Sequence, residues 1–182
     1  MDTRTEMIKG AARTFETEGF RGVGVDRLLA PSGSSTRTLY KHFGSRDGLV
    51  VAVLEARHRA FMDRLGAEAD EIDPIGSLFD TLRRWLETHG AWGCMLLRAR
   101  SEYASANAEI VALVEQQKRE FREAVARRVE IGLGRADTGL ATQVWLLFEG
   151  ATAAASVSDV AVIEEAKRAA RALAAVASGR GP

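Results

Sequence analysis

The spacing of apolar residues restricts the fold of this 182-residue chain more than any other feature of its sequence. Apolar residues recur three and four positions apart almost from end to end, as they do on the buried face of an amphipathic helix. The clearest stripe is Ile110, Val114, Phe121, Val125 and Val129. No stretch of strand length alternates apolar with polar residues. The sequence therefore predicts an all-α fold.

The first helix is predicted to begin in the sequence TRTE and to end at Gly19, a residue type that commonly stops helices. The Thr3 side chain would accept from the backbone N–H of Glu6 while the Glu6 side chain reaches back, which forms a capping box. The expected inner stripe is Ile8, Ala11, Ala12 and Phe15. Further along, Ser45 is expected to cap a long helix from Arg46 to about Gly66.

The stretch SSTRTLYKHF, residues 34–43, combines hydroxyl, cationic and aromatic side chains in one short segment. With Ser35 as its cap, a helix over 36–43 spans about 12 Å, which is near the width of the DNA major groove. Leu39 and Phe43 lie four positions apart and face inward together. The outward residues are Thr36, Arg37, Tyr40 and Lys41, with Thr38 and His42 at the flanks. Such residues suit phosphates and base edges, although a solvated polar face is the plainer interpretation of the pattern.

The preceding segment GVDRLLAPSG supplies a shorter helix and a turn at Ser32 and Gly33, so the two helices together predict a helix-turn-helix. Just downstream, the helix start at Ser45 and Arg46 offers free backbone N–H groups and a guanidinium. We expect these groups to bind a phosphate beside the groove.

Residues 20–54 also resemble the DNA-binding region of TetR-type bacterial transcriptional repressors. The similarity is carried by a Leu-Tyr-x-x-Phe helix end, here Leu39, Tyr40 and Phe43, preceded by a glycine-containing turn. The segments GCMLLRARSEY and LLFEGATAAASV resemble the regulatory half of such proteins more weakly. The resemblance implies a ligand-responsive regulator of about nine helices, in most cases a repressor, that binds a palindromic double-stranded DNA operator as a homodimer and is released by a small-molecule inducer.

By position, the resemblance places the base-reading and phosphate-binding roles on one short set of residues. They are Thr36, Arg37, Thr38, Tyr40, Lys41 and His42, with Arg46 as the phosphate-contacting cation. It implies a DNA-binding domain over residues 1–47 and a ligand-binding and dimerisation domain over 48–182. The chain departs from the family pattern at Val23 and Gly24, where many members have a hydroxyl, and at Pro31, which we expect to shorten or bend the second helix.

The last two helical segments, ATQVWLLFEGATAAASV and DVAVIEEAKRAARALAAVA, are rich in small and apolar residues. Small side chains let helix backbones approach closely. We interpret the pair as a subunit interface that forms a four-helix bundle with a second copy, while completion of the monomer's own core is the alternative.

Aromatic and thioether side chains are concentrated in the middle of the chain, where the resemblance implies an inducer pocket. The predicted ligand-binding residues are Trp85, Phe121, Trp145, Phe148 and Glu149. Glu149 and Glu102 sit in apolar helical contexts, so each is expected to pair with a neighbour such as Arg98 or Arg100, or to contact a ligand. Cys94, the single cysteine, is expected to be a small buried residue, with redox sensing as the alternative.

Composition excludes several other classes of protein. The 25 basic and 25 acidic residues cancel, so overall charge gives no argument for nucleic acid binding. We expect no enzyme activity, no metal site and no cofactor, because no nucleophile with a base, phosphate loop or spaced metal ligands is found. We also expect no membrane segment and a cytoplasmic location. The rival interpretation is a helical dimeric small-molecule-binding protein whose helix-turn-helix no longer binds DNA.

Overall fold

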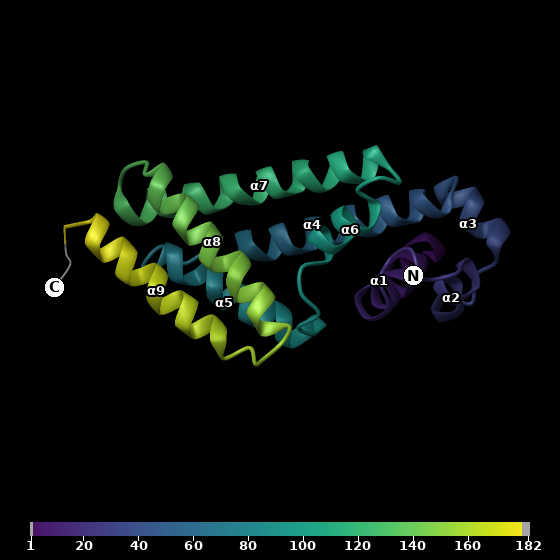
Figure 1. The fold of residues 1–182 in the computed structure, drawn as a ribbon, viewed down its shortest axis with the longest axis horizontal. Coiled ribbons are helices and arrows are strands. Elements are labelled where there is room, and N and C mark those ends of the chain that lie inside the picture. The colour runs from purple at the N-terminus through teal and green to yellow at the C-terminus, as the bar shows by residue number, and fades with distance from the viewer. Residues whose placement is uncertain (1, 180–182) are drawn as a thin grey trace. The chain divides into compact units, whose positions relative to one another are not determined.

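The computed structural model describes residues 2–179, which form nine α-helices and one short 3-10 helix and contain no strand (Figure 1). The all-α prediction is confirmed. The elements are α1 (Thr3–Glu18), α2 (Val25–Leu29), η1 (Ala30–Ser32), α3 (Thr36–Phe43), α4 (Arg46–Ala67), α5 (Pro74–His89), α6 (Met95–Tyr103), α7 (Ala108–Leu133), α8 (Thr138–Ala155) and α9 (Val162–Ala177).

The chain divides into two compact units, each with its own hydrophobic core. Unit 1 takes in the chain up to Ala60 together with Met95–Gln117, and unit 2 takes in Phe61–Cys94 and the chain from Lys118 onward. Helices α4 and α7 therefore contribute their first parts to unit 1 and the rest to unit 2. The functional division at residues 47 and 48 stays a prediction.

In unit 1, α1 ends where the sequence indicates but begins differently. Gly19 ends the helix with a φ of 80°, in the region that favours glycine, and its N–H donates to the Phe15 carbonyl at 3.2 Å. The predicted capping box is wrong, because Asp2 occupies the cap position and Thr3 already lies inside the first turn. No side chain caps this helix.

The buried face of α1 is also turned slightly from the predicted stripe. Ala11 and Phe15 are fully buried as expected, whereas Ile8 and Ala12 lie at its half-buried edge. The other buried residues of α1 are Met7, Gly10 and Thr14. The Phe15 ring stacks on the Phe20 ring with centroids 4.6 Å apart, which fixes the start of the α1–α2 loop in the core of unit 1.

Pro31 shortens the second helix as its sequence predicts. α2 is only five residues long and passes directly into the 3-10 turn η1, which contains Pro31. Gly33 then reverses the chain with a φ of 61°. The tighter turn accommodates a residue that has no N–H to donate.

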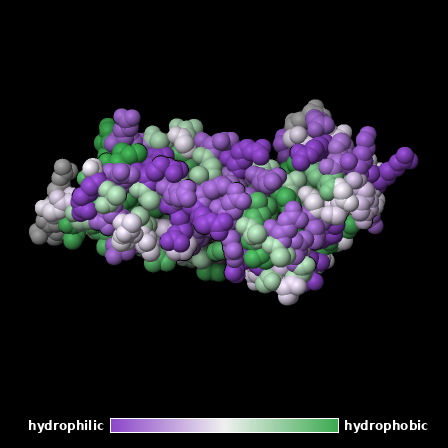
Figure 2. All heavy atoms as spheres, turned by 90° about the horizontal axis from the view of Figure 1, so that it is seen from above, coloured by the Kyte–Doolittle hydropathy of each residue, from purple (hydrophilic) through white to green (hydrophobic). Residues whose placement is uncertain are grey.

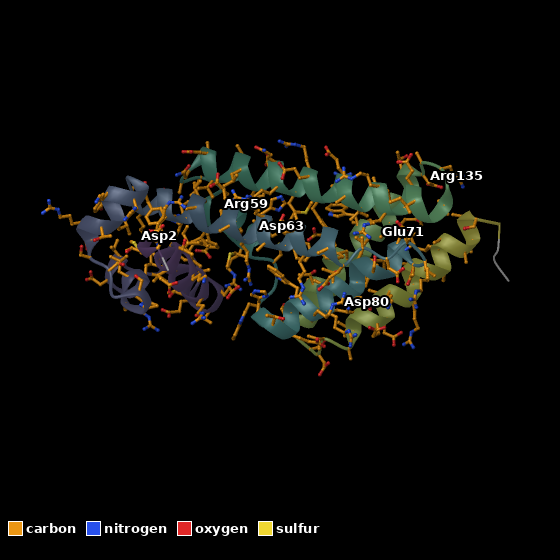
Figure 3. All side chains as sticks on the ribbon, turned by 180° about the vertical axis from the view of Figure 1, so that it is seen from behind. Asp2, Arg59, Asp63, Glu71, Asp80 and Arg135 are labelled. Atoms are coloured by element: carbon orange, nitrogen blue, oxygen red, sulfur yellow. The ribbon has the colours of Figure 1, made fainter. Side chains whose placement is uncertain are left out.

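In unit 2, α8 packs against α9, and α9 also packs against α5 (Figure 1). Aspartates cap two of these helices: Asp73 accepts from the Gly76 N–H at 2.9 Å, and Asp137 accepts from the Leu140 N–H at 3.0 Å. The Leu140 hydrogen bond, reinforced by Arg135, lowers the pKa of the Asp137 carboxyl. Arg135, labelled in Figure 3, also donates to the Ala177 carbonyl at 3.0 Å and so ties the α7–α8 loop to the end of α9.

The predicted stripe of α7 is buried along its whole length, which confirms the periodicity. Ile110 and Val114 belong to the core of unit 1, and Phe121, Val125 and Val129 belong to the core of unit 2. On the face shown in Figure 2, hydrophilic side chains predominate and hydrophobic ones form smaller patches between them. Among the residues that the structure describes, no helix has the length and hydropathy needed to cross a membrane.

Candidate nucleic-acid interface

Helix α3 is bounded by two local signals. The Ser35 hydroxyl accepts from the Thr38 N–H at 3.2 Å and lies 2.9 Å from the Thr38 hydroxyl, so it caps the helix as predicted. At the other end Gly44, with a φ of 72°, donates its N–H to the Tyr40 carbonyl at 3.0 Å. Leu39 is fully buried and anchors the helix in the core of unit 1.

The remaining side chains of α3 are distributed as the helical spacing indicates. The exposed ones are Thr36, Arg37, Tyr40 and Lys41, and the half-buried ones at the flanks are Thr38 and His42. Tyr40 is 53% exposed, which is a large fraction for an aromatic residue. One face of α3 therefore presents hydroxyl, cationic and phenolic groups together.

The cations on this face are not neutralised by the protein. Among the described residues, neither Arg37 nor Lys41 has an acidic partner. A further cation, Arg4 of α1, lies over the Phe43 ring at 5.2 Å from its centroid and likewise has no ion pair in the described part of the chain. Sequence reasoning missed Arg4, because nothing in the local pattern of α1 indicates that it ends beside α3.

Arg46 does not stand free beside α3 as we expected. One terminal nitrogen of its guanidinium, Nη1, donates to the Tyr103 hydroxyl at 2.9 Å. The other, Nη2, donates to the Val23 carbonyl at 2.9 Å and also to the Phe20 carbonyl. Its side chain is only 23% exposed. The guanidinium is therefore already engaged inside unit 1, and its contact with a phosphate stays a prediction.

Residues 7–53, which hold most of α1, all of α2, η1 and α3, and the start of α4, match the family model of bacterial regulatory proteins of the tetR family. Over this segment the chain belongs to the TetR family. Its fold is that of solved TetR regulators over nearly the whole chain. A TetR-family transcriptional regulator from Streptomyces coelicolor superposes with a TM-score of 0.82 at 22% identity, covering 97% of this chain and 96% of that one. A TetR regulator from Haloarcula marismortui gives 0.80 at 19% identity, covering 96% and 97%.

Two curated relatives match part of this chain in sequence. The HTH-type transcriptional repressor AcnR of Corynebacterium glutamicum is 30% identical over 97 residues, which are 53% of this chain and 47% of that protein. The HTH-type transcriptional repressor NicS of Pseudomonas putida is 34% identical over 59 residues, which are 32% of this chain and 28% of that protein. These matches span less than half the length of either relative. The TetR family consists of regulators rather than enzymes, as the sequence predicts.

The predicted ligand-binding aromatics divide into two groups in unit 2. Phe121 and Phe148 are each 5% exposed, and their ring centroids lie 4.7 Å apart. The Phe61 ring lies between this pair and Trp85, at 5.9 Å from Phe121 and 5.2 Å from Trp85. Phe61 packs edge to face against the other three rings, and the four rings fill part of the core of unit 2, so a ligand that reached them would have to displace them.

Trp145 packs against the edge of the same core and also lines a surface groove of about 380 Å³ between α7 and α8. The Arg122 guanidinium lies over the Trp145 ring at 4.7 Å. On the inner side, the Trp145 indole Nε1–H donates to Glu149 at 3.1 Å, and Lys118 donates to the same Glu149 oxygen at 2.6 Å. Glu149 is therefore paired, as expected, and its binding of a ligand stays a prediction.

Glu102 and Cys94 differ from their expected environments. Glu102 pairs with neither Arg98 nor Arg100, and instead accepts from the backbone N–H groups of Phe20 and Arg21. Cys94 is half-buried rather than fully buried. Burial lowers the pKa of Lys118, but the nearby Cys94 and Glu149 outweigh it and raise that pKa. Among the described residues, no group of three potential metal ligands comes together.

Proposed function

We propose that the chain is a ligand-responsive transcriptional regulator that binds a palindromic DNA operator as a homodimer, in most settings as a repressor. The observation that supports this best is the free face of α3, where Arg37, Tyr40 and Lys41 are exposed together on a capped, well-anchored helix. Such a helix inserts into the major groove, where guanidinium and ammonium groups bind guanine edges or phosphates and hydroxyls bind phosphates. The helix-turn-helix of residues 1–47 would bind the DNA operator in this way.

The second subunit is proposed to pack against one face of α8 and α9. Along α8 the exposed positions that share a face are Gln143, Leu146, Gly150 and Ala153. Along α9 the half-exposed and exposed positions that share a face are Val162, Ala166, Ala169, Leu173 and Val176. These side chains are mostly small or apolar, which favours close packing of helices in a two-fold four-helix bundle.

The inducer is proposed to bind within residues 48–182, where Trp85, Phe121, Trp145, Phe148 and Glu149 offer aromatic surface and one carboxylate. Binding would favour arrangements of the dimer in which the two α3 helices no longer fit one duplex. Apolar or aromatic molecules suit such walls best.

Selection from a pool of random DNA duplexes tests the DNA-binding role. We expect the purified protein to enrich a palindrome whose half-sites lie about one helical turn apart, roughly 34–36 Å, or a multiple of it. Its affinity for that palindrome should fall steeply as salt rises, because cations on α3 replace counterions on phosphates. Failure to enrich any duplex at low salt would instead favour a helical small-molecule-binding protein that does not bind DNA.

A further inference from the structure

The loop between α1 and α2 is held by side chains that come from two other helices of unit 1. Phe20 lies at the centre of this loop, with its ring fully buried against Phe15 and 6.3 Å from the Tyr103 ring. Its backbone N–H is bonded by Glu102 of α6, and its carbonyl is bonded by Arg46 of α4. We call Arg46, Glu102 and Tyr103 the Phe20 hub.

Glu102 acts as a cap for backbone N–H groups that are distant in sequence. Its Oε2 accepts from the Phe20 N–H at 2.9 Å and from the Arg21 N–H at 2.8 Å, and its Oε1 lies 3.1 Å from the Phe20 nitrogen. A Cβ at Gly19 would lie 3.0 Å from Oε1, so the helix-ending glycine also leaves room for the carboxylate. Charge-assisted bonds of this kind are roughly twice as strong as neutral ones.

Arg98 binds backbone carbonyl groups in the same region, whereas Glu102 binds backbone N–H groups. One of its terminal nitrogens, Nη1, donates to the Phe15 carbonyl at 3.2 Å and to the Glu16 carbonyl at 2.7 Å. These carbonyls lie in the last turn of α1, where a helix carries partial negative charge. Helix α6 thus presents a cation to the end of α1 and an anion to the N–H groups that follow it.

Arg46 is the member of the Phe20 hub that lies next to α3 in the sequence. Only Gly44 and Ser45 separate it from the last residue of α3, so its position and the end of α3 are set together. Its two terminal nitrogens reach the carbonyls of Phe20 and Val23 and the Tyr103 hydroxyl. The same hydroxyl donates to Asp47 at 3.2 Å. A lysine ammonium offers three donors at one point and cannot reproduce the planar fork that these separated acceptors require.

We propose that Arg46 and Glu102 are positioning residues for DNA binding, which hold α3 in place through the Phe20 loop, and that Arg46 makes no contact with phosphate. This inference rests on the proposed DNA-binding function. It assigns the cation at the start of α4 a role inside the protein. The phosphate contacts then belong to the exposed set on α3, above all Lys41.

Arg46→Lys and Arg46→Met separate positioning from phosphate contact. We expect both variants to bind the duplex selected by the wild-type protein on the order of tenfold more weakly or worse at fixed salt, because hydrogen bonds from a charged donor are lost. The slope of log affinity against log salt should stay at the wild-type value in both. In the comparison variant Lys41→Ala this slope should become less steep by about one, because a phosphate contact is removed. The proposal is contradicted if Arg46→Lys binds the duplex as tightly as the wild-type protein. It is also contradicted if the salt slope of Arg46→Met is less steep than the wild-type slope by about one.

Glu102→Gln tests the hub by a measurement that needs no DNA. Its amide keeps one acceptor oxygen, so we expect the amides of Phe20 and Arg21 to exchange with deuterium faster while the rest of unit 1 keeps its protection. Affinity for the selected duplex should fall with an unchanged salt slope. Glu109→Gln, which alters an exposed carboxylate at the start of α7, should change neither quantity. Unchanged exchange at Phe20 and Arg21 overturns the hub, whereas faster exchange in a protein that binds no duplex overturns only the DNA-binding function.

Discussion

Lys167 and Lys118 show how unit 2 accommodates charge in its interior. Lys167 is 8% exposed, and its ammonium donates to both oxygens of Asp80, at 2.6 and 2.7 Å (Asp80 is labelled in Figure 3). Lys118 is matched in the same way by Glu149. A buried charge without a partner is costly, so each lysine stabilises the carboxylate beside it and is stabilised in return. By contrast, Arg37 and Lys41 of α3 have no acidic partner among the described residues and can bind an external anion.

Glu68 gives a residue-scale prediction on pH. It accepts from Arg64 at 2.8 Å and from Arg84 at 2.8 and 3.1 Å. Burial alone raises the pKa of this carboxyl, but the hydrogen bonds from Arg84 and Arg64 outweigh it and lower the pKa to about 2, against 4.5 for an ordinary glutamate. The folded state therefore favours the charged form. Its contribution to stability is fully present above pH 4.5 and is lost as the pH falls through about 2.

We expect Glu68→Gln to lower the free energy of unfolding at pH 7 by about 1 kcal/mol, a value reduced from the full pKa shift because the side chain is partly screened by solvent. The difference from wild type should shrink as the pH falls below 4.5. Urea titrations across this range measure it. Glu71→Gln is the matched control, because Glu71 is exposed and has no ion pair within the described residues (Figure 3). A difference for Glu68→Gln that does not vary with pH would refute the assignment.

At the scale of elements, the helix-turn-helix depends on its caps and on tertiary packing. α2 has five residues and α3 has eight, and helices of this length are marginal in isolation. α3 is held by the Ser35 cap, the buried Leu39 and the chain reversal at Gly44. The position of α3 is therefore fixed by the residues around it rather than by its own helix propensity.

Removal of the side-chain cap of α3 should be measurable as lost stability. Ser35→Ala deletes the hydroxyl that accepts the Thr38 N–H, and we expect a loss of about 1 kcal/mol in the free energy of unfolding. Chemical denaturation measures the loss. Ser34→Ala, one position earlier and with no side-chain hydrogen bond in the described part of the chain, should stay within about 0.5 kcal/mol of wild type. Equal effects of the two substitutions would show that the cap contributes nothing.

Two helical glycines give opposite predictions for the same substitution. A Cβ at Gly10 in α1 would lie 3.0 Å from the Pro31 Cβ, and the proline ring cannot rotate away. A Cβ at Gly66 in α4 would meet nothing within 4 Å. We expect Gly10→Ala to lower the free energy of unfolding by about 1 kcal/mol through overpacking. Gly66→Ala should raise it by up to about 1 kcal/mol through helix propensity. Thermal and urea unfolding of both variants measure these changes. A stabilised Gly10→Ala variant would show that α1 and η1 have room for the added methyl group.

The elements were predictable because their signals are local. The stripe of α7 and the caps at Ser35 and Ser45 all appear in the sequence within a few residues of where they act. The capping box at Thr3 failed because the neighbouring Asp2 occupies the cap position. Such competition between adjacent residues is not resolved by a motif alone.

The partners of single side chains were harder to predict, because they are distant in sequence. Arg46 bonds to Phe20, Val23 and Tyr103, and no local pattern indicates that these residues converge. For Glu102, the sequence indicated a need for a partner but named the wrong kind, since an arginine and a backbone N–H satisfy a carboxylate equally well. The exposed face of α3 was predictable for the opposite reason: its side chains have few protein contacts at all.

For the whole molecule, the proposed function requires two copies of α3 in one assembly. A single helix of eight residues contacts only a few base pairs, so affinity and specificity depend on doubling the contact through a two-fold axis. The face of α8 and α9 described above supplies a surface suited to that axis. DNA binding should therefore depend on dimerisation. A substitution on this face of α8 or α9, far from α3 in sequence, should weaken DNA binding.

Leu146→Glu tests this coupling. Leu146 is 56% exposed on the proposed face of α8, so a carboxylate there costs little in the isolated subunit. In a two-fold bundle it would be buried against apolar side chains without a partner, which costs several kcal/mol per ion. We expect the variant to keep its helical circular dichroism, to sediment as a monomer, and to bind the selected palindrome at least tenfold more weakly, while its affinity for a single half-site stays the same.

Ile131→Glu is the matched control for this substitution, because Ile131 is 60% exposed but belongs to α7 rather than to α8 or α9. It introduces the same charge at the same degree of exposure and should leave both the oligomeric state and the affinity for the palindrome unchanged. Dissociation by Ile131→Glu but not by Leu146→Glu would place the subunit interface on α7. A wild-type protein that sediments as a monomer at every concentration and still binds the palindrome tightly would remove the need for a two-fold assembly, since one copy of α3 would then be enough.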